Sequence, residues 1–226
     1  MVVIFDVVGT LFSLSRVRAV FRDASVPEDF LPFWFARLLH VSMGSALANR
    51  YVPFRDAAES SLRQALAFRD LPAAVVPAAL QAMRHLEPWD DVRACLGLLR
   101  QAGHSLVALS NSSLDTVHAL LDGAEITRLF ELVVSVDEVR RPKRDPAPYW
   151  RVLERSGVTA SGACMIAAHA WDVQGAAAVG LRAVWVSRLE KVWSFPSRPP
   201  AHAVATLDEV PAAVADIALE EAIGRP

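Results

Sequence analysis

The sequence has few of the features that mark secreted, membrane and metal-binding proteins. Cysteine occurs only twice, at Cys95 and Cys164, and each stands in an apolar run, so two buried thiols are favoured over a disulfide or a metal site. The most apolar stretch, residues 71–80, is about half as long as a bilayer span requires and contains two prolines. The first residues show no positive segment and include an acid at position 6, which argues against a signal peptide. We therefore expect a cytoplasmic protein without a membrane partner.

An excess of either charge is also absent. The 23 basic residues nearly balance the 25 acidic ones, for a formal net charge of −2. The sequence therefore lacks the excess of basic residues that is typical of nucleic-acid-binding proteins, so a small-molecule partner is favoured. Lysine is scarce and occurs only as Lys143 and Lys191. Hydrophobic residues make up 53% of the 226 residues, enough for one large core and a smaller insertion.

Short apolar runs, most of them rich in β-branched residues, recur along the chain and predict buried strands. They cover residues 2–8, 105–109, 132–136, 164–168 and 183–186. The helical patterns between them each end near a glycine, a usual helix stop, and cover residues 91–101, 114–121 and 146–155. Alternating strands and helices predict a parallel sheet covered on both faces, which is an α/β fold with a Rossmann-like core.

The segment between residues 15 and 89 has a different character. It contains no convincing strand and carries long helical patterns at 30–48, 54–68 and 73–86. Because it follows the first strand, we expect it above the carboxyl ends of the strands, where open parallel sheets bind ligands. The predicted organisation is a core of residues 1–13 and 90–226 with a helical cap of residues 14–89. A turn-rich loop precedes a last helix from about Leu207.

Polar residues stand at or just beyond the ends of the predicted strands. They are Asp6, the run Ser110-Asn111-Ser112, Lys143, and Asp172. Asp6 alone is explained equally well as a cap of the next turn or as a catalytic acid. The carboxyl ends of the strands converge on one crevice, so two carboxylates, a hydroxyl and an ammonium can meet there.

Four motifs in this order resemble the haloacid dehalogenase superfamily, and specifically the type II L-2-haloacid dehalogenases. They are Asp6 with Gly9-Thr10-Leu11, then Leu109-Ser110-Asn111, then Lys143 to Tyr149, and finally Ala170-Trp171-Asp172. The resemblance covers nearly the whole chain. It implies that Asp6 attacks C2 of a small 2-substituted carboxylic acid in an SN2 step, and that water hydrolyses the resulting ester.

The resemblance also implies roles for the other site residues. Lys143 would keep Asp6 ionised, and Asp172 would orient Lys143 and the hydrolytic water. Further residues are expected to position the reacting groups: Thr10 and Ser110 for the carboxylates, Asn111 for the substrate carboxylate, and Tyr149 and Trp171 for the shape of the site.

Two departures from the phosphatases of this superfamily favour a metal-free reaction. Val8 stands where those enzymes have a general acid, and Ala168 stands where they have a further metal-binding acid. Magnesium requires several oxygen ligands, and Asp6 with Asp172 would hold it poorly. No cofactor is expected, and Mg²⁺ would be needed only if the protein were a phosphatase.

Two further departures concern the leaving group. Alignment with the dehalogenases places Phe35 at the position of their halide-binding arginine, and Arg37, about 200° further around the helix, should face away. His169 replaces an asparagine, and it would serve either as an acid, a base or a halide-side donor, or only as a loop histidine. Phe33 and Trp34 are expected mainly to pack within the cap.

Three alternatives therefore remain beside the dehalogenase. They are a phosphatase, a C–N hydrolase acting on a strained ring, and a binding protein that has lost turnover. A small carboxylic acid is the expected partner, and a homodimer is left open as the assembly.

Overall fold

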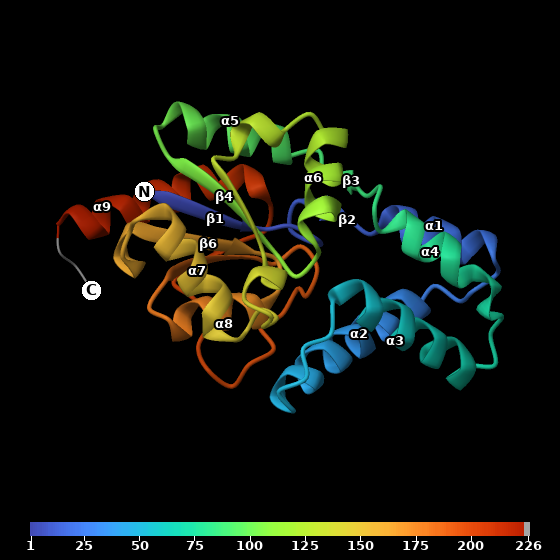
Figure 1. The fold of residues 1–226 in the computed structure, drawn as a ribbon. Coiled ribbons are helices and arrows are strands. Elements are labelled where there is room, and N and C mark those ends of the chain that lie inside the picture. The colour runs from blue at the N-terminus through green and yellow to red at the C-terminus, as the bar shows by residue number, and fades with distance from the viewer. Residues whose placement is uncertain (224–226) are drawn as a thin grey trace.

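The core of the protein is a six-stranded parallel sheet with the order β5-β4-β1-β6-β7-β8 (Figure 1). The computed structural model describes residues 1–223. The strands are β1 (Val2–Asp6), β4 (Ser105–Ser110), β5 (Leu132–Ser135), β6 (Ala163–Ala167), β7 (Arg182–Val186) and β8 (His202–Val204). All neighbours in this sheet pair in parallel, and β1 lies between β4 and β6. The predicted α/β fold is confirmed, with one edge strand, β8, that we did not expect.

Helices cover both faces of the sheet (Figure 1). They are α5 (Val92–Gln101), α6 (Leu114–Gly123), α7 (Pro146–Ser156), α8 (Ala170–Ala178) and α9 (Val210–Ala222), with short 3-10 turns η2 (Thr127–Leu129), η3 (Val136–Glu138), η4 (Ala160–Gly162) and η5 (Leu207–Glu209). Successive side chains of β1 point to opposite faces. Val3 and Phe5 pack in the cluster that contains α5 and α9, and Val2 and Ile4 pack in the cluster that contains α7 and α8. The central strand is therefore buried on both sides, as its apolar run predicts.

The cap is a separate group of helices beside the core (Figure 1). It consists of α1 (Ser15–Asp23), α2 (Phe30–Leu47), α3 (Phe54–Phe68), the turn η1 (Ala73–Val75) and α4 (Val76–Ala82). Its centre is Trp34, which is fully buried against Phe21 and donates its indole N–H to Ser61 Oγ at 3.1 Å. The expected packing role of Trp34 is confirmed. The expected helix over 73–86 was too long, because α4 ends at Ala82.

A two-stranded antiparallel ribbon connects the cap to the core. It pairs β2 (Phe12–Ser13) with β3 (Glu87–Pro88), and the Trp89 N–H donates to Leu11 O at 3.0 Å. The expectation of no strand between residues 15 and 89 is therefore wrong at β3. The pairing brings the start and the end of the insertion side by side.

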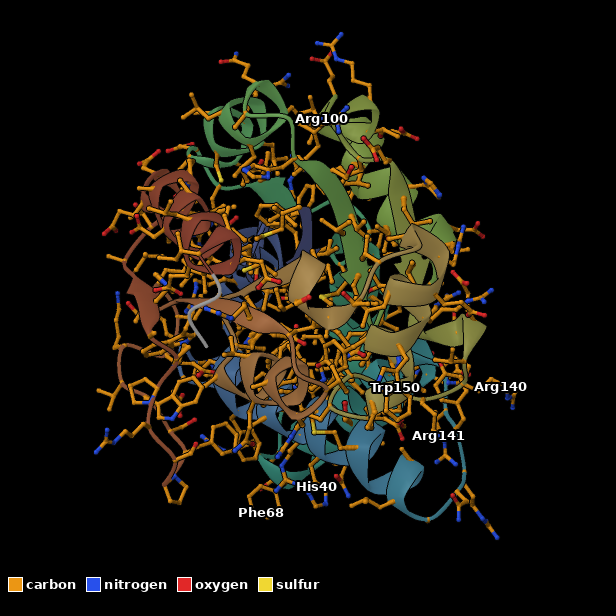
Figure 2. All side chains as sticks on the ribbon, turned by 90° about the vertical axis from the view of Figure 1, so that its left-hand side faces the viewer. His40, Phe68, Arg100, Arg140, Arg141 and Trp150 are labelled. Atoms are coloured by element: carbon orange, nitrogen blue, oxygen red, sulfur yellow. The ribbon has the colours of Figure 1, made fainter. Side chains whose placement is uncertain are left out.

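The other side of the cap is fastened to the core by two arginines of the loop after η3 (Figure 2). Arg141 donates to Ala46 O at 3.1 Å and to Asn49 Oδ1 at 3.0 Å, both near the end of α2. The Arg140 guanidinium lies 5.5 Å from the centre of the Tyr51 ring, and the Tyr51 hydroxyl contacts Asp137. With the ribbon, these contacts hold the cap at two places.

Two expectations from composition can be compared with the structure. Cys95 and Cys164 are both buried and unpaired, as predicted. Among residues 1–223, the helices are all too short or too polar to cross a bilayer.

Candidate active site

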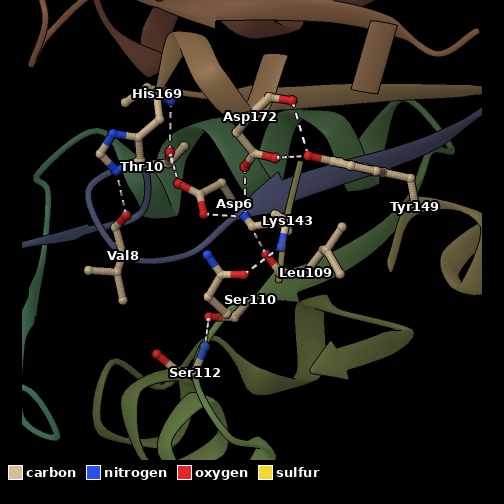
Figure 3. Close-up of polar contacts among 12 residues, drawn as sticks. Asp6, Val8, Thr10, Leu109, Ser110, Ser112, Lys143, Tyr149, His169 and Asp172 are labelled. Carbon is tan, nitrogen blue, oxygen red and sulfur yellow. Dashed lines mark hydrogen bonds and ion pairs between the residues drawn. The ribbon is translucent and has the colours of Figure 1, made fainter. Parts of the chain in front are cut away.

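An ammonium group lies at the centre of the polar residues predicted from the sequence (Figure 3). Lys143 Nζ lies 2.5 Å from Asp6 Oδ1, 2.6 Å from Asp172 Oδ2 and 3.0 Å from Leu109 O, so each of its three protons has an acceptor. Its side chain is 1% exposed. Burial disfavours the charged form, but the two carboxylates outweigh it and raise the pKa of Lys143. The ammonium is therefore a permanent cation at neutral pH.

Asp6 ends the central strand β1, and both of its carboxylate oxygens accept hydrogen bonds. Lys143 donates to Oδ1, and Thr10 Oγ1 donates to Oδ2 at 2.6 Å. Thr10 Oγ1 in turn accepts the N–H of Ala168 at 2.8 Å, which ties the turn after β1 to the end of β6. The turn passes through Gly9 at φ +91°, a value that favours glycine. The Asp6 carboxylate is thus held in one orientation.

Asp172 lies in the first turn of α8 and is fully buried. The Tyr149 hydroxyl donates to its Oδ1 at 2.6 Å, and Lys143 donates to its Oδ2. Burial raises the pKa of Asp172, and the hydrogen bonds from Lys143 and Tyr149 oppose that rise. Burial and the Asp172 charge raise the pKa of Tyr149 well above its usual range, so its hydroxyl remains a donor. Gly175 makes room for this hydroxyl, because a Cβ there would lie 2.5 Å from the Tyr149 oxygen.

The last residue of β4 and the two residues after it line the cavity at Asp6, and Asn111 also supports Lys143. Asn111 Oδ1 accepts the backbone N–H of Lys143 at 2.8 Å. Ser110 Oγ accepts the N–H of Ser112 at 3.0 Å, and Ser135 Oγ donates to Ser112 O at 2.8 Å. Ser135 was missed in the sequence, and Ser112, which was grouped with Ser110 and Asn111, was given no role.

The cavity at the Asp6 carboxylate is small, with a volume of about 20 Å³. Many of the residues singled out in the sequence line it. The lining consists of Asp6, Val8, Phe35, Leu39, Phe54, Ser110, Asn111, Ser112, His169 and Trp171. A space of this size holds about one water molecule. Residues of the cap, Phe35, Leu39 and Phe54, therefore leave little free space beside the Asp6 carboxylate.

Three rings form one wall of this cavity. The Phe35 ring stacks on the His169 ring with centroids 5.6 Å apart, and His169 stacks on Trp171 at 5.2 Å. Arg37 lies elsewhere, as predicted, because its guanidinium sits 4.6 Å from the Phe33 ring centre and 4.9 Å from that of Phe68. Arg37 therefore does not take the place of the halide-binding arginine that the dehalogenases have at the position of Phe35.

His169 is buried with an acceptor at each ring nitrogen. Nε2 lies 3.2 Å from Val8 O, and Nδ1 lies 3.7 Å from Glu190 Oε1. Burial opposes a charge on the ring, but Glu190, Asp6 and Asp172 outweigh it and raise the pKa of His169. This environment favours the imidazolium form. Gly9 permits the close approach, because a Cβ there would lie 2.6 Å from Nε2.

Glu190 was missed by the sequence reasoning. It lies in the loop after β7, and its Oε2 accepts the N–H of Ala170 at the start of α8 at 2.9 Å. No motif surrounds it in the sequence, and only the sheet order brings the loop after β7 next to the loop after β6.

The donor set of the site does not fit a magnesium ion. Val8 and Ala168 offer no side-chain oxygen, and the Lys143 ammonium already lies between the carboxylates of Asp6 and Asp172. In residues 1–223, no group of three or more His, Cys, Asp or Glu side chains is arranged to hold a metal ion.

The fold and these motifs define a haloacid dehalogenase-like hydrolase. The model of the haloacid dehalogenase-like hydrolase family matches residues 1–180, so the chain belongs to that family. (S)-2-Haloacid dehalogenase 1 of Pseudomonas sp. (strain CBS-3) is 29% identical over 214 residues, which cover 92% of this chain and 93% of the relative. The (S)-2-haloacid dehalogenase of Pseudomonas sp. (strain YL) is 30% identical over 212 residues, covering 91% and 90%.

Solved structures agree with these relatives. The L-2-haloacid dehalogenase from Xanthobacter autotrophicus superposes with a TM-score of 0.86 at 27% identity and covers 95% of this chain and 98% of its own. The same enzyme with chloropropionic acid covalently bound gives a TM-score of 0.83 at 27% identity, with the same coverage. The expected enzyme class, a 2-haloacid dehalogenase-like hydrolase, is confirmed.

Proposed function

We propose that the protein hydrolyses small (S)-2-haloacids through an ester on Asp6. A carboxylate oxygen of Asp6 attacks C2, the bond from C2 to the halogen breaks, and the halide leaves with the bonding electrons. Water then attacks the ester carbonyl, which releases the 2-hydroxy acid and restores Asp6. The observation that carries this proposal is the Asp6 carboxylate, fixed by Lys143 and Thr10 at the small cavity.

The other site residues support both steps without a metal ion. Lys143 keeps Asp6 ionised, and Asp172 holds Lys143 and orients the hydrolytic water. Ser110 and Asn111 line the cavity and receive the substrate carboxylate. The orphan indole N–H of Trp171 has no hydrogen-bond partner within residues 1–223, so it can donate to a bound anion. Tyr149 fixes Asp172 through its hydroxyl and does not line the cavity at Asp6.

His169 supplies the positive charge on the leaving-group side in our proposal. Both of its nitrogens face acceptors, which supports an imidazolium and leaves no lone pair for a base. Its charge stabilises the departing halide beside His169 and Trp171, because Phe35 offers no charge there. Since the imidazolium is the active form, activity should fall as the pH rises through the His169 pKa.

The variant His169→Asn tests this role. We expect the basic limb of the pH profile of ester formation to disappear, with a loss of rate at pH 6 that exceeds the loss at pH 9. Single-turnover measurements between about pH 5 and 9 span the range in which a histidine titrates. Loss of an acidic limb would instead identify His169 as a base, and an unchanged profile would remove it from the reaction.

A release assay tests the function itself. The wild-type protein is mixed with (S)- and (R)-2-chloropropionate, a strained cyclic amino acid and a phosphate monoester, each with and without EDTA. We expect chloride release from the (S)-acid alone, unchanged by EDTA and absent in Asp6→Asn. Magnesium-dependent phosphate release would favour the phosphatase, ring opening would favour the C–N hydrolase, and binding without turnover would favour a binding protein.

A further inference from the structure

A second, much larger cavity lies on the other side of the ring wall. Its volume is about 470 Å³. The side chains around it are mostly apolar and include Leu14, Leu31, Trp89 and Leu189. Phe35, Leu39, His169 and Trp171 line both this cavity and the one at Asp6. These four residues therefore separate two spaces that would otherwise join.

The small cavity alone does not have room for a substrate. A volume of about 20 Å³ holds about one water molecule, whereas even 2-chloropropionate has six heavy atoms. His169 is anchored to Val8 and Glu190 by its nitrogens. Phe35 is half-buried and has no polar anchor, and it projects from α2 of the cap. Rotation of the Phe35 ring is thus the simplest way to connect the two spaces.

We propose that the larger cavity receives the substituent on C2 of the substrate, so that the preferred substrates carry an apolar chain or ring in place of a methyl group. We call this cavity the side-chain pocket. The inference rests on the proposed function, because it assumes that C2 lies at Asp6. A substrate held there would direct its C2 substituent past Phe35 into the side-chain pocket.

The charged residues of the side-chain pocket are Arg18, Glu190 and the His169 imidazolium, whose two nitrogens face Val8 O and Glu190 and not the pocket. Arg18 is exposed to solvent. Glu190 is engaged with the Ala170 N–H and with His169, and so contributes little free charge to the interior. An apolar chain of several carbons would replace water against Leu31, Leu189 and Trp89, which is favourable for each methylene buried.

A series of (S)-2-bromoalkanoates from propionate to octanoate tests the proposal. We expect kcat/KM to rise about fourfold for each added methylene until the pocket is filled, the ratio that corresponds to about 0.8 kcal/mol per buried methylene. A flat or falling series, with bromide still released from 2-bromopropionate, would overturn the side-chain pocket and leave the proposed function intact.

A variant that fills the pocket gives the sharper comparison. Ala36 is exposed on α2 and lines the side-chain pocket but not the cavity at Asp6. Ala36→Phe should remove the rise with chain length and change kcat/KM for 2-bromopropionate less than twofold. The matched control Ala48→Phe, at the exposed end of the same helix and away from the pocket, should keep the wild-type series. Equal behaviour of the two variants would refute the assignment.

A binding measurement with unreactive alkanoates tests the side-chain pocket even if no haloacid is turned over. Trp89 and Trp171 line the pocket, so their fluorescence should report unreactive alkanoates such as butyrate, hexanoate and octanoate. We expect the Kd to fall with chain length in the wild type and not in Ala36→Phe. The absence of bromide release from every acid would defeat the proposed function, and a Kd independent of chain length would defeat the side-chain pocket.

Discussion

Replacement of Lys143 by methionine should cost stability in a way that depends on pH. The substitution keeps most of the side-chain volume but removes the ammonium that accompanies two buried carboxylates, of which Asp6 is 4% exposed and Asp172 is 0% exposed. Breaking a buried ion pair by removing one partner typically costs about 3–5 kcal/mol, because a charge is left uncompensated. We expect a loss of that size at pH 8.

The sign of the pH effect follows from the carboxylates. Without Lys143 the two facing carboxylates repel one another, so their pKa values in the folded state rise above those in the unfolded state. A carboxyl group with a raised folded pKa binds protons more tightly when folded, so the loss should shrink as the pH falls towards 5. In the wild type the Lys143 contribution is fully present at all these pH values, because its pKa is raised.

Urea unfolding at pH 5, 6, 7 and 8 measures this loss. The matched control is Lys191→Met, which removes the only other lysine at an exposed position and should change the free energy of unfolding by less than about 0.5 kcal/mol. A loss in Lys143→Met that is the same at pH 5 and pH 8 would refute the assignment of Lys143 as the counter-charge of the pair.

Three other changes should be as informative. Gly175→Ala places a Cβ 2.5 Å from the Tyr149 hydroxyl and should reduce kcat more than tenfold. The control Gly44→Ala, whose Cβ would meet no atom outside its own stretch of helix, should leave kcat within twofold. Equal activities would show that the Tyr149 contact is dispensable. Thr10→Val leaves the Ala168 N–H without an acceptor and should cost about 1–3 kcal/mol in urea unfolding, so an unchanged midpoint would speak against that bond. EDTA should not reduce halide release, and rescue by Mg²⁺ would contradict the metal-free site.

The sequence sufficed for the sheet and for the central residues of the site. Asp6 and Lys143 could be placed together because parallel strands end at one edge of the sheet, and the two side chains do meet at 2.5 Å. The buried strands were visible as apolar runs, since both faces of the sheet are covered. β8 was missed because it has only three residues and follows a turn-rich loop.

The remaining differences arise from contacts between distant segments. The predicted helix over 73–86 ends at Ala82, and residues 87 and 88 pair with β2, an interaction that local propensity does not reveal. The helix α1 was not assigned, although Val17, Val20 and Phe21 already show a helical spacing. Glu190 reaches His169 only through the order of β6 and β7 in the sheet.

The protonation state of His169 also depends on contacts with distant segments of the chain. The sequence left an acid, a base and a structural histidine open, because each is compatible with a histidine after a strand. The two acceptors at its nitrogens, Val8 O and Glu190, favour the imidazolium. Neither acceptor could be assigned from spacing alone, because Val8 O is a backbone oxygen and Glu190 lies in the loop after a different strand.

A single turnover in H₂¹⁸O tests the ester on Asp6 most directly. The protein is used in excess over (S)-2-chloropropionate, and both the 2-hydroxy acid and the peptide that contains Asp6 are analysed by mass spectrometry. Covalent catalysis predicts ¹⁸O in the Asp6 carboxylate and ¹⁶O in the first product, because water attacks the ester carbonyl. Appearance of ¹⁸O in the first product, with an unlabelled Asp6, would show direct attack of water on C2 and would contradict the role of Asp6 as the nucleophile.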